Sequence, residues 1–397
     1  MKSVSICNLK KYNRKKTSLR NHYFKTPLLT AISATLLSLS LNPAAFAVTD
    51  EEFRQLQDQF NQLADEVENN KRAPASNNTH IGGYGELHYN NLNNGKGDAK
   101  KQLDLHRFVL FLGHDFNDKT RFFSELEVEH ANTEENGVVE VEQAYVQFDL
   151  NNSTRLNAGV ILVPVGIINE THEPPAFYGV ERNPVEKYII PTTWSGGGVM
   201  LSGHYSNGFS YDVALHSGLK TDITKNNGTD IRGGRQGISE AEANNLAATA
   251  RAKYTGFRGL ELAATVQFQD NITQNHSNNV NSATLVETHA RYNIHHFTLT
   301  GLYARWDING DGASSLQRNI QDGAYLEAAY KISPNVGIFA RQNQWDNGGT
   351  GDTRKTQTNA GINYWPNENI VVKADYQAQN ETAGNFDGFN LGIGYQF

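Results

Sequence analysis

The stretch Pro164–Thr193 holds the densest group of side chains that could act on a solute. It reads PVGIINETHEPPAFYGVERNPVEKYIIPTT, and its candidate residues are Glu170, His172, Glu173, Glu181, Arg182, Glu186 and Lys187. Apolar residues such as Phe177 and Ile189 could anchor it. Carboxylates and cations held at a narrow point select solutes by charge and size. We therefore expect this stretch to fold inward and narrow a passage; the alternative is an external cap.

A second set of ionisable side chains occurs at alternate positions of short segments. Glu125 and Glu127, for example, alternate with Leu126 and Val128. Because strand side chains alternate between two faces, such a segment has one charged face and one apolar face. Unpaired charges do not survive in apolar interiors, so the charged faces meet either bulk solvent outside a sandwich or a water-filled lumen. We expect a lumen, lined by Arg107, Glu125, Glu127, Arg251, Lys253, Glu287, Arg291, Glu327, Arg341, Lys373 and Asp375.

No single sign of charge dominates this wall set. Acidic and basic walls that face each other would create a transverse field across the lumen. The alternative is that each charge only solvates a wide lumen, and the sequence does not show which strands face each other.

One short stretch resembles the start of a calcium loop. Asp307, Asn309 and Asp311 follow the pattern D-x-N-x-D-G, but the twelfth position is Arg318 where a calcium loop has glutamate. Runs of Asn, Asp and Gly are also ordinary turn chemistry. These three residues are therefore a weak calcium candidate, and no other metal site or cofactor is expected. The sequence has no H-E-x-x-H, G-x-S-x-G or P-loop motif, so we expect no enzyme.

The segments between His80 and Phe397 predict a β-barrel. We count sixteen strand-like segments, most of them 10 to 14 residues long, which suits a tilted membrane strand. Tight turns alternate with longer connections, the pattern of an outer-membrane barrel. We predict an all-β fold: a 16-stranded antiparallel transmembrane β-barrel over 80–397 with a long loop at 164–193.

The N-terminal part differs from the rest. Residues 1–47 combine a basic region, an apolar run and Ala45-Phe46-Ala47, which predicts a cleaved signal peptide. The alternative for residues 1–47 is a retained membrane anchor. Apolar residues at heptad spacing predict a short coiled-coil helix in 48–72, and the alternative there is an amphipathic helix that lies on its own domain. Residues 73–79 read as a linker.

Composition excludes several classes of protein. The chain has 35 Lys and Arg against 42 Asp and Glu, and residues 1–47 hold eight of the basic and none of the acidic ones, so the remainder carries −15. That charge argues against a nucleic-acid partner. The single cysteine, Cys7, lies in the expected signal peptide, so a disulfide is excluded after cleavage.

The chain ends on an alternating strand. Leu391, Ile393, Tyr395 and Phe397 share one face, which we expect to contact lipid, while Asn390 and Gln396 face the lumen. This strand must pair with the first one to close the barrel.

These features together resemble the general porins of Gram-negative bacteria. The heptad stretch, the long loop after the fifth strand and the segment VERNPVEKYIIPTTW (180–194) are most similar to the phosphate-selective porin O and P family. The resemblance implies a homotrimer, a pore narrowed by an infolded loop, and anion passage over lumenal Arg and Lys. The terminal aromatic, Phe397, resembles the signal that the barrel-assembly machinery reads. The mixed charges of the wall set and the net charge of −15 depart from the family pattern and leave phosphate selectivity open.

We therefore expect an outer-membrane porin for passive diffusion of small hydrophilic solutes or ions, with anions such as phosphate among the candidates. Its N-terminal helix would lie in the periplasm and its partners would be outer-membrane lipid and two further copies of the chain. The alternative is an adhesin or receptor barrel that acts through its external loops.

Overall fold

The computed structural model describes residues 78–95, 99–131, 137–275, 280–380 and 386–397. The expected signal peptide, the expected coiled coil and all of the linker except Asn78 and Thr79 lie outside these residues.

The described residues contain sixteen β-strands. Their bounds are β1 Thr79–Asn93, β2 Ala99–Asn117, β3 Thr120–Glu129, β4 Val138–Asn151, β5 Thr154–Leu162, β6 Ser195–His204, β7 Phe209–His216, β8 Ala247–Tyr254, β9 Leu260–Gln269, β10 Ala283–Ile294, β11 Phe297–Ile308, β12 Ile320–Ser333, β13 Val336–Asp346, β14 Lys355–Asn367, β15 Ile370–Asn380 and β16 Asp387–Gln396.

Short helical turns lie only in the connections of the described chain. They are η1 Pro174–Ala176, α3 Val185–Tyr188, η2 Asn226–Gly228, η3 Arg232–Gly234 and α4 Asp311–Ser315. In the described residues, we find no helix with the length and apolarity needed to cross a membrane.

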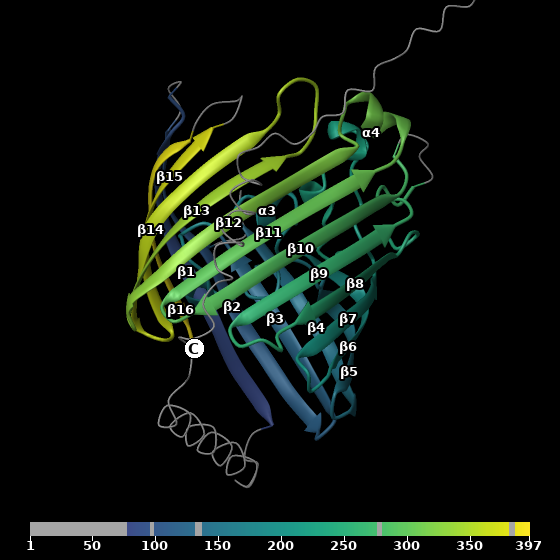
Figure 1. The fold of residues 1–397 in the computed structure, drawn as a ribbon. Coiled ribbons are helices and arrows are strands. Elements are labelled where there is room, and N and C mark those ends of the chain that lie inside the picture. Colours follow the sequence, from purple (N-terminus) through teal and green to yellow (C-terminus); the bar gives the residue numbers. More distant parts are fainter. Residues whose placement is uncertain (1–77, 96–98, 132–136, 276–279, 381–385) are drawn as a thin grey trace, which may run out of the picture. The chain divides into compact units, whose positions relative to one another are not determined.

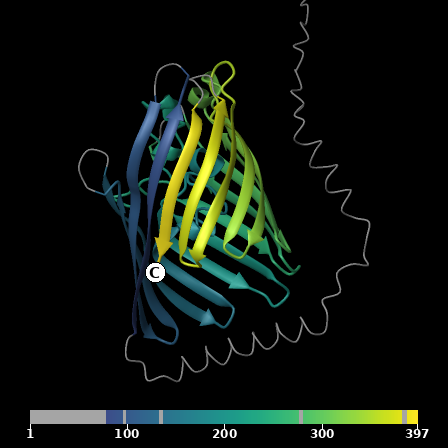
Figure 2. The ribbon, with the colours of Figure 1, turned by 90° about the vertical axis from the view of Figure 1, so that its left-hand side faces the viewer.

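The sheet closes on itself. Each strand pairs antiparallel with its neighbours in the chain, and β1 pairs with β16, from Tyr84 opposite Gln396 to Asn93 opposite Asp387. Figure 2 shows these first and last strands side by side, and Figure 1 shows the tilted strands that make up the wall. Closure satisfies the edge hydrogen bonds of both terminal strands. The predicted 16-stranded antiparallel barrel is confirmed.

Connections at the two ends of the barrel differ in length. At one end, β2 and β3 are joined by residues 118–119 and β4 and β5 by residues 152–153. At the other end, residues 163–194 join β5 to β6 and residues 217–246 join β7 to β8. The C-terminus lies at the end with the short turns, and α4 lies at the opposite end (Figure 1). The predicted sorting of short and long connections is therefore confirmed.

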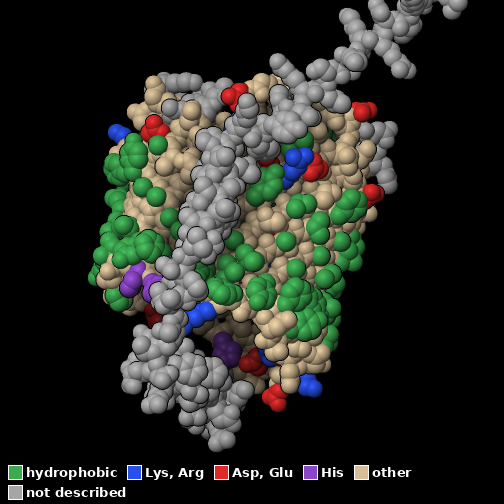
Figure 3. All heavy atoms as spheres, in the orientation of Figure 1, with side chains coloured by type: hydrophobic (Ala, Val, Ile, Leu, Met, Phe, Trp, Pro, Cys, Tyr) green, Lys and Arg blue, Asp and Glu red, His purple; other side chains and the backbone are tan. Residues whose placement is uncertain are grey.

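The polarity of the barrel is reversed relative to a soluble protein. On β9, Leu262, Val266 and Phe268 are 42%, 46% and 46% exposed, whereas the alternating Thr265 and Gln267 are buried inside the barrel. Figure 3 shows hydrophobic side chains across the visible outer face. This alternation of apolar outward and polar inward residues follows from the strand period of two and suits a lipid environment.

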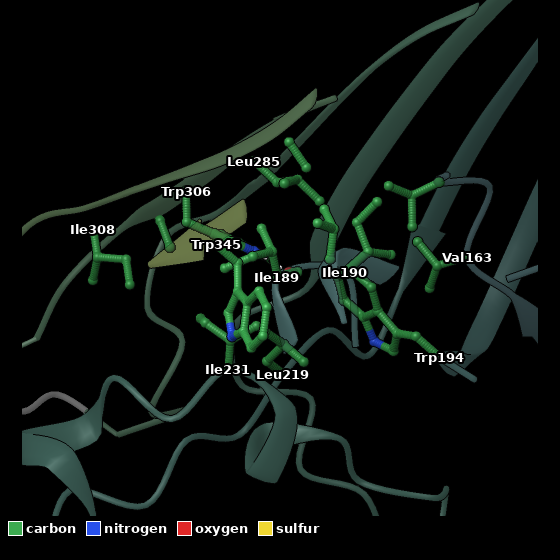
Figure 4. Close-up of a cluster of buried hydrophobic side chains, with 14 of the residues drawn as sticks. Val163, Ile189, Ile190, Trp194, Leu219, Ile231, Leu285, Trp306, Ile308 and Trp345 are labelled. Atoms are coloured by element: carbon green, nitrogen blue, oxygen red, sulfur yellow. Dashed lines mark hydrogen bonds between the residues drawn. The ribbon is translucent and has the colours of Figure 1, made fainter. Parts of the chain in front are cut away.

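A hydrophobic cluster fills part of the interior. Ile189 and Ile190 of the β5–β6 connection pack with Trp306 of β11, Trp345 of β13 and Leu219 of the β7–β8 connection (Figure 4). All five side chains are at most 2% exposed. The cluster joins the long connections to the inward faces of β10–β13, so apolar packing holds those connections inside the barrel at this side.

The last residue takes part in closure, which generates the first prediction. The backbone N–H of Phe397 donates to the Gly83 oxygen at 2.9 Å, and that of Gly83 donates to the Phe397 oxygen at 2.9 Å. Deleting Phe397 removes both bonds, each worth about 1 kcal/mol, and exposes the end of the β1–β16 seam. We expect a several-fold lower yield of folded barrel, measured by the heat-dependent mobility shift on SDS gels.

Phe397→Tyr is the matched control, because it retains the aromatic ring and both backbone bonds. Equal folded yields for the deletion and the tyrosine variant would contradict this role of the terminal residue.

Candidate functional site

Residues 163–194, which we call the inner segment, form a loop whose two ends are tied together. The backbone N–H of Val163 donates to the Trp194 oxygen at 2.9 Å. The side-chain amide of Asn169 donates to the Val163 oxygen at 2.7 Å, and its own oxygen accepts from the Trp194 N–H at 2.6 Å. Asn169 is completely buried. A loop closed in this way keeps its shape although it has only short helical turns.

Glu186 holds the inner segment together from within. Its carboxylate accepts hydrogen bonds from the backbone N–H groups of Ile167 and Ile168 at 2.7 and 2.6 Å, and from the Tyr325 hydroxyl at 2.7 Å. Its exposure is 0%. Bonds to a buried carboxylate are stronger than neutral ones. The structure therefore places Glu186 as an internal anchor, away from any open space, where the sequence suggested a charge facing a passage.

Two residues, Arg251 and His172, form the ion pairs that fix one side of the inner segment to the wall. Arg251 of β8 lies 3.1 Å from Glu170 and 2.7 Å from Asp212 of β7, measured between Nη2 and the carboxylate oxygens. His172 Nε2 lies 3.3 Å from Glu125 of β3 and 3.5 Å from Glu142 of β4. Both residues tie the segment to strands that lie close to β5 and β6 in the sheet, on the side of the barrel from which the segment enters the interior.

A β-bulge brings Glu142 to this place. Glu125 pairs with Gln143 and Leu126 pairs with Val141, so Glu142 is the unmatched residue. A bulge shifts the alternation of a strand by one position and re-aims a side chain. Glu142 is consequently 2% exposed and lies beside His172. Although burial lowers the pKa of His172, hydrogen bonds to the two carboxylates raise it to about 9.

The other side of the inner segment is attached to β13 and β15. The backbone N–H of Val180 donates to Asp375 Oδ2 at 2.7 Å. Arg341 Nη1 donates to the Tyr178 oxygen at 3.3 Å. Lys373 Nζ lies 3.6 Å from the centre of the Phe177 ring, a favourable placement for a cation. The wall charges Asp375, Arg341 and Lys373 thus position the segment.

Glycine on β16 makes room for the segment. A Cβ at Gly394 would lie only 2.2 Å from Pro174 Cβ, and one at Gly392 would lie 3.1 Å from a Val180 methyl. The small inward face of the last strand is therefore a packing surface for the inner segment.

A cavity of about 630 Å³ remains between the inner segment and the opposite wall. The inner segment contributes Val180, Glu181, Arg182, Lys187, Thr192 and Thr193; the β7–β8 connection contributes Arg232 and Arg235; the wall and its ends contribute Glu86, His88, Asn90, Lys100, Gln102, Asp104, His106, Arg107, Glu129, His130 and Gly137. Four of the cations come from the segment and the connection, whereas three of the four acids and all three histidines come from the wall. The wall side also carries Lys100 and Arg107, so its net charge is −1 against +3 on the facing side with the histidines neutral, and this difference sets up a transverse field.

Individual cations of the cavity differ in their bonding. Arg232 Nη1 donates to the backbone oxygens of Lys187 and Thr192 at 3.0 and 2.7 Å. In the described part of the chain, Nε and Nη2 of Arg182 are buried without a hydrogen-bond partner. Burial lowers the pKa of Lys187. Arg182 therefore lines this cavity with two guanidinium nitrogens whose hydrogen-bonding capacity is unused.

The residues expected from sequence divide into three groups. Glu181, Arg182, Lys187 and the wall residue Arg107 line the cavity; Glu170, His172, Glu186, Glu125, Arg251, Arg341, Lys373 and Asp375 position the segment; Glu127, Lys253, Glu173, Glu287, Arg291 and Glu327 lie outside the cavity lining. Arg107 is held by Glu86 at 2.8 Å and Glu127 at 3.1 Å. The inner segment thus contributes both cavity residues and anchors, which sequence reasoning did not separate.

Several cavity residues were missed by sequence reasoning. His88 shares a strand face with Glu86 and Asn90, so the alternation on β1 could have found it. His106 was hidden, because alternation that places Arg107 inward places His106 outward. His130, Arg232 and Arg235 lie in connections, where no periodicity applies.

The weak calcium candidate has a different geometry. Nε and Nη2 of Arg305 donate hydrogen bonds to the two carboxylate oxygens of Asp307 at 3.0 and 2.7 Å. The side-chain amide of Asn309 donates to Ser282 Oγ at 2.7 Å. Asp311 begins the helical turn α4. Among the described residues, the groups of close metal-ligating side chains include none of these three.

No protein-family model matches the sequence. An uncharacterized protein of Aquifex aeolicus (strain VF5) is 30% identical over 337 residues, which are 75% of this chain and 74% of that protein.

Solved structures with a similar fold include an anion-selective porin and an outer membrane channel. Salmonella typhi OmpF in complex with daunomycin has a TM-score of 0.57 at 16% identity and covers 81% of this chain and 98% of its own. The anion-selective porin from Comamonas acidovorans has a TM-score of 0.56 at 13% identity, with 80% and 99% covered. The outer membrane channel DcaP of Acinetobacter baumannii has a TM-score of 0.54 at 13% identity, with 80% and 97% covered. At these identities the likeness shows the fold.

The place of Glu186 predicts that its loss loosens the inner segment. Glu186→Ala removes the acceptor of hydrogen bonds worth roughly 1.5–3 kcal/mol each. We expect trypsin to cleave the folded protein after Arg182 or Lys187 at least about tenfold faster, since about 1.4 kcal/mol corresponds to a factor of ten. Tyr325→Phe, which removes one bond, should have a smaller effect. Glu368→Ala, at an exposed turn carboxylate, is the control; equal cleavage of E186A and E368A would contradict the anchor.

The pKa of His172 predicts a pH-dependent stability. Because the folded pKa of about 9 exceeds the ordinary value of about 6.5, the stabilising effect of charged His172 is complete below pH 6.5 or so and is lost as the pH rises through about 9. His172→Ala leaves two buried carboxylates without their cation and should cost roughly 3 kcal/mol at pH 6, and distinctly less at pH 10.

Thermal unfolding in detergent at both pH values measures this difference. His204→Ala, at an exposed histidine, is the matched control. A destabilisation by H172A that is the same at pH 6 and pH 10 would show that the charge of His172 has no part in it.

Proposed function

This chain belongs to the same family as the uncharacterized protein of Aquifex aeolicus, and we propose that it forms a water-filled channel of the outer membrane through which small hydrophilic solutes and ions diffuse passively. One observation carries the proposal: a closed barrel with an apolar outer face encloses a cavity of about 630 Å³ lined mostly by polar and charged side chains. A packed soluble barrel would not place this many charges inside.

Placement in the outer membrane is supported by the fold and by the outward apolar residues. Only helices and closed barrels satisfy all backbone hydrogen bonds in lipid. Solved proteins that share the fold are described as porins or outer-membrane channels. The expected signal peptide at 1–47 supplies the export that such a location requires. We infer no enzymatic activity.

The inner segment would be the constriction of this channel. Glu181, Arg182 and Lys187 come from it and line the cavity, opposite the wall of β1–β3. Its anchors, such as the bonds of Glu186 to Tyr325 of β12 and of Val180 to Asp375 of β15, hold it across the interior. A segment fixed on two sides narrows a passage without closing it, so size selection would arise here.

The charges of the cavity favour anions. Its lining has six lysines and arginines against four acidic residues, a net of +2 with the histidines neutral. Basic linings select anions in pores, and a cleft of one net sign concentrates ions of the other. We therefore propose a preference for small anions, with phosphate as one candidate, although the whole chain is acidic.

The proposal extends to assembly. A homotrimer fits the porin resemblance, and the heptad stretch in 48–72 would join three copies in the periplasm. Phe397 would be read by the barrel-assembly machinery. Cross-linking of the folded protein with and without residues 48–72 would reveal a trimer and its dependence on this segment.

An adhesin or receptor acting through external loops is the second candidate. Planar-bilayer recording of the purified folded protein separates the two: stable single-channel conductance supports a channel, and its absence from folded protein overturns the channel proposal.

Arg182 provides the prediction on selectivity. Arg182→Glu reverses the charge of a cavity-lining residue of the inner segment and should lower the anion-to-cation permeability ratio several-fold, measured as the reversal potential in a salt gradient. Lys225→Glu makes the same charge change at an exposed external residue outside the cavity. An equal shift for both variants would show that selectivity arises from overall charge and not from this constriction.

A further inference from the structure

Three histidines and two carboxylates gather on one side of the cavity. His88 lies on β1, Asp104 and His106 on β2, His130 directly after β3, and Glu181 on the inner segment. The His88 and His106 rings stack with centroids 4.8 Å apart, and the His130 ring lies 5.5 Å from that of His106. Anion passage over lysine and arginine does not require such a group.

The ligand atoms of this group are close enough to share one ion. One atom from each of His88, His106 and Glu181 lies within 4.8 Å of the other two. The inner segment supplies the carboxylate, and two neighbouring strands supply the imidazoles. A cation that forms bonds of about 2.0–2.2 Å to nitrogen and oxygen needs only small side-chain movements to bind these three ligand atoms.

Neighbouring carboxylates hold the imidazoles as they do in metal sites. Glu86 Oε2 lies 3.1 Å from His88 Nε2, and Asp104 Oδ2 lies 3.2 Å from His106 Nδ1. A carboxylate that accepts from one ring nitrogen leaves the other nitrogen free to bind a metal and fixes the direction of the ring. The sequence places such a partner two residues away from each histidine, on the same strand.

One atom of the group is buried and lacks a hydrogen bond. Nδ1 of His88 has no hydrogen-bond partner in the described residues, although His88 is only 4% exposed. It lies 3.3 Å from Glu181 Oε1. A buried ring nitrogen without a hydrogen bond is costly. A cation bound to it and to Glu181 Oε1, which also accepts from Asn90 at 2.9 Å, would satisfy the nitrogen.

A second β-bulge places His106 in the group. Glu86 pairs with Arg107 and Leu87 pairs with Leu105, so His106 is the extra residue of β2. Without the bulge, His106 would point to the outer face. Bulges are frequent beside functional sites because they re-aim single side chains. The strand therefore departs from regular pairing at the one position that brings a second imidazole beside His88.

We propose that this channel binds a divalent transition-metal ion through His88, His106 and Glu181. Two imidazoles and one carboxylate suit Zn²⁺, Ni²⁺ or Cu²⁺ and do not suit Ca²⁺ or Mg²⁺, which take oxygen ligands. Three protein ligands leave a coordination position open to water or to a passing anion. Lys187 and Arg182 of the cavity oppose a cation, and Glu86 and Asp104 favour it. The ion would bridge the inner segment to the wall and narrow the cavity.

Untagged folded protein in detergent, freed of metal by a chelator, tests the site, since a polyhistidine tag would bind the same ions. Calorimetric titration with zinc sulfate should show saturable binding at one ion per chain. His88→Ala and His106→Ala should each weaken the zinc affinity at least tenfold. His204→Ala, which removes an exposed histidine at the end of β6, should leave the affinity unchanged. Calcium chloride in excess should not compete. Binding that survives H88A and H106A, or no binding, overturns the proposal.

Cobalt chloride gives a test that needs no variant. Cobalt bound by two nitrogen ligands in a site of low coordination number should give visible absorption bands, and zinc should abolish these bands. This result does not depend on whether H106A folds. A spectrum identical to that of cobalt in buffer overturns the proposal. Zinc should also lower single-channel conductance in the natural protein but not in H88A. Only this conductance measurement rests on the channel function, so binding without conductance would overturn the channel and retain the metal site.

Discussion

Closure of the sheet is the constraint on which the rest of the molecule depends. A sheet with one apolar face turned outward survives in lipid only if every strand has two partners, and the pairing of β1 with β16 completes that condition. Closure also decides the interior, because alternation then turns every second side chain inward. The charges, amides and histidines that fill the barrel are a consequence of the outer face being apolar.

The interior created by closure is divided into two unlike halves. At β10–β13, tryptophans and β-branched residues pack with the long connections and exclude water. At β1–β3, ionisable residues leave open space. The inner segment separates the halves and uses both, since Ile189 and Ile190 belong to the cluster while Glu181 and Arg182 belong to the cavity. The packing of Ile189 and Ile190 in the hydrophobic cluster thus fixes the backbone that carries Glu181 and Arg182. Without that packing, these two long side chains would move freely in the cavity.

The sequence predicted the fold well because strand period, strand length and loop sorting are local properties. The sixteen strands and their order followed from alternation such as that of Glu125 and Leu126. The site was harder for two physical reasons. Which strands face each other is set by closure, so the opposition of Arg182 to His88 has no local signal. Bulges at His106 and Glu142 shift the alternation by one residue, and a rule based on alternation assigns such residues to the wrong face. Glu186 shows the same limit: its charge was visible, but its burial depends on Tyr325 from a distant strand.

The sequence distance of the anchors sets an order of folding events. Val180 is bound by Asp375, 195 residues later in the chain, and Pro174 packs against Gly394 of the last strand. These contacts form only after the final strands have joined, because loop closure over such distances is slow relative to local pairing. The side of the inner segment that contacts β15 and β16 can therefore reach its final position only after these last strands have joined the wall.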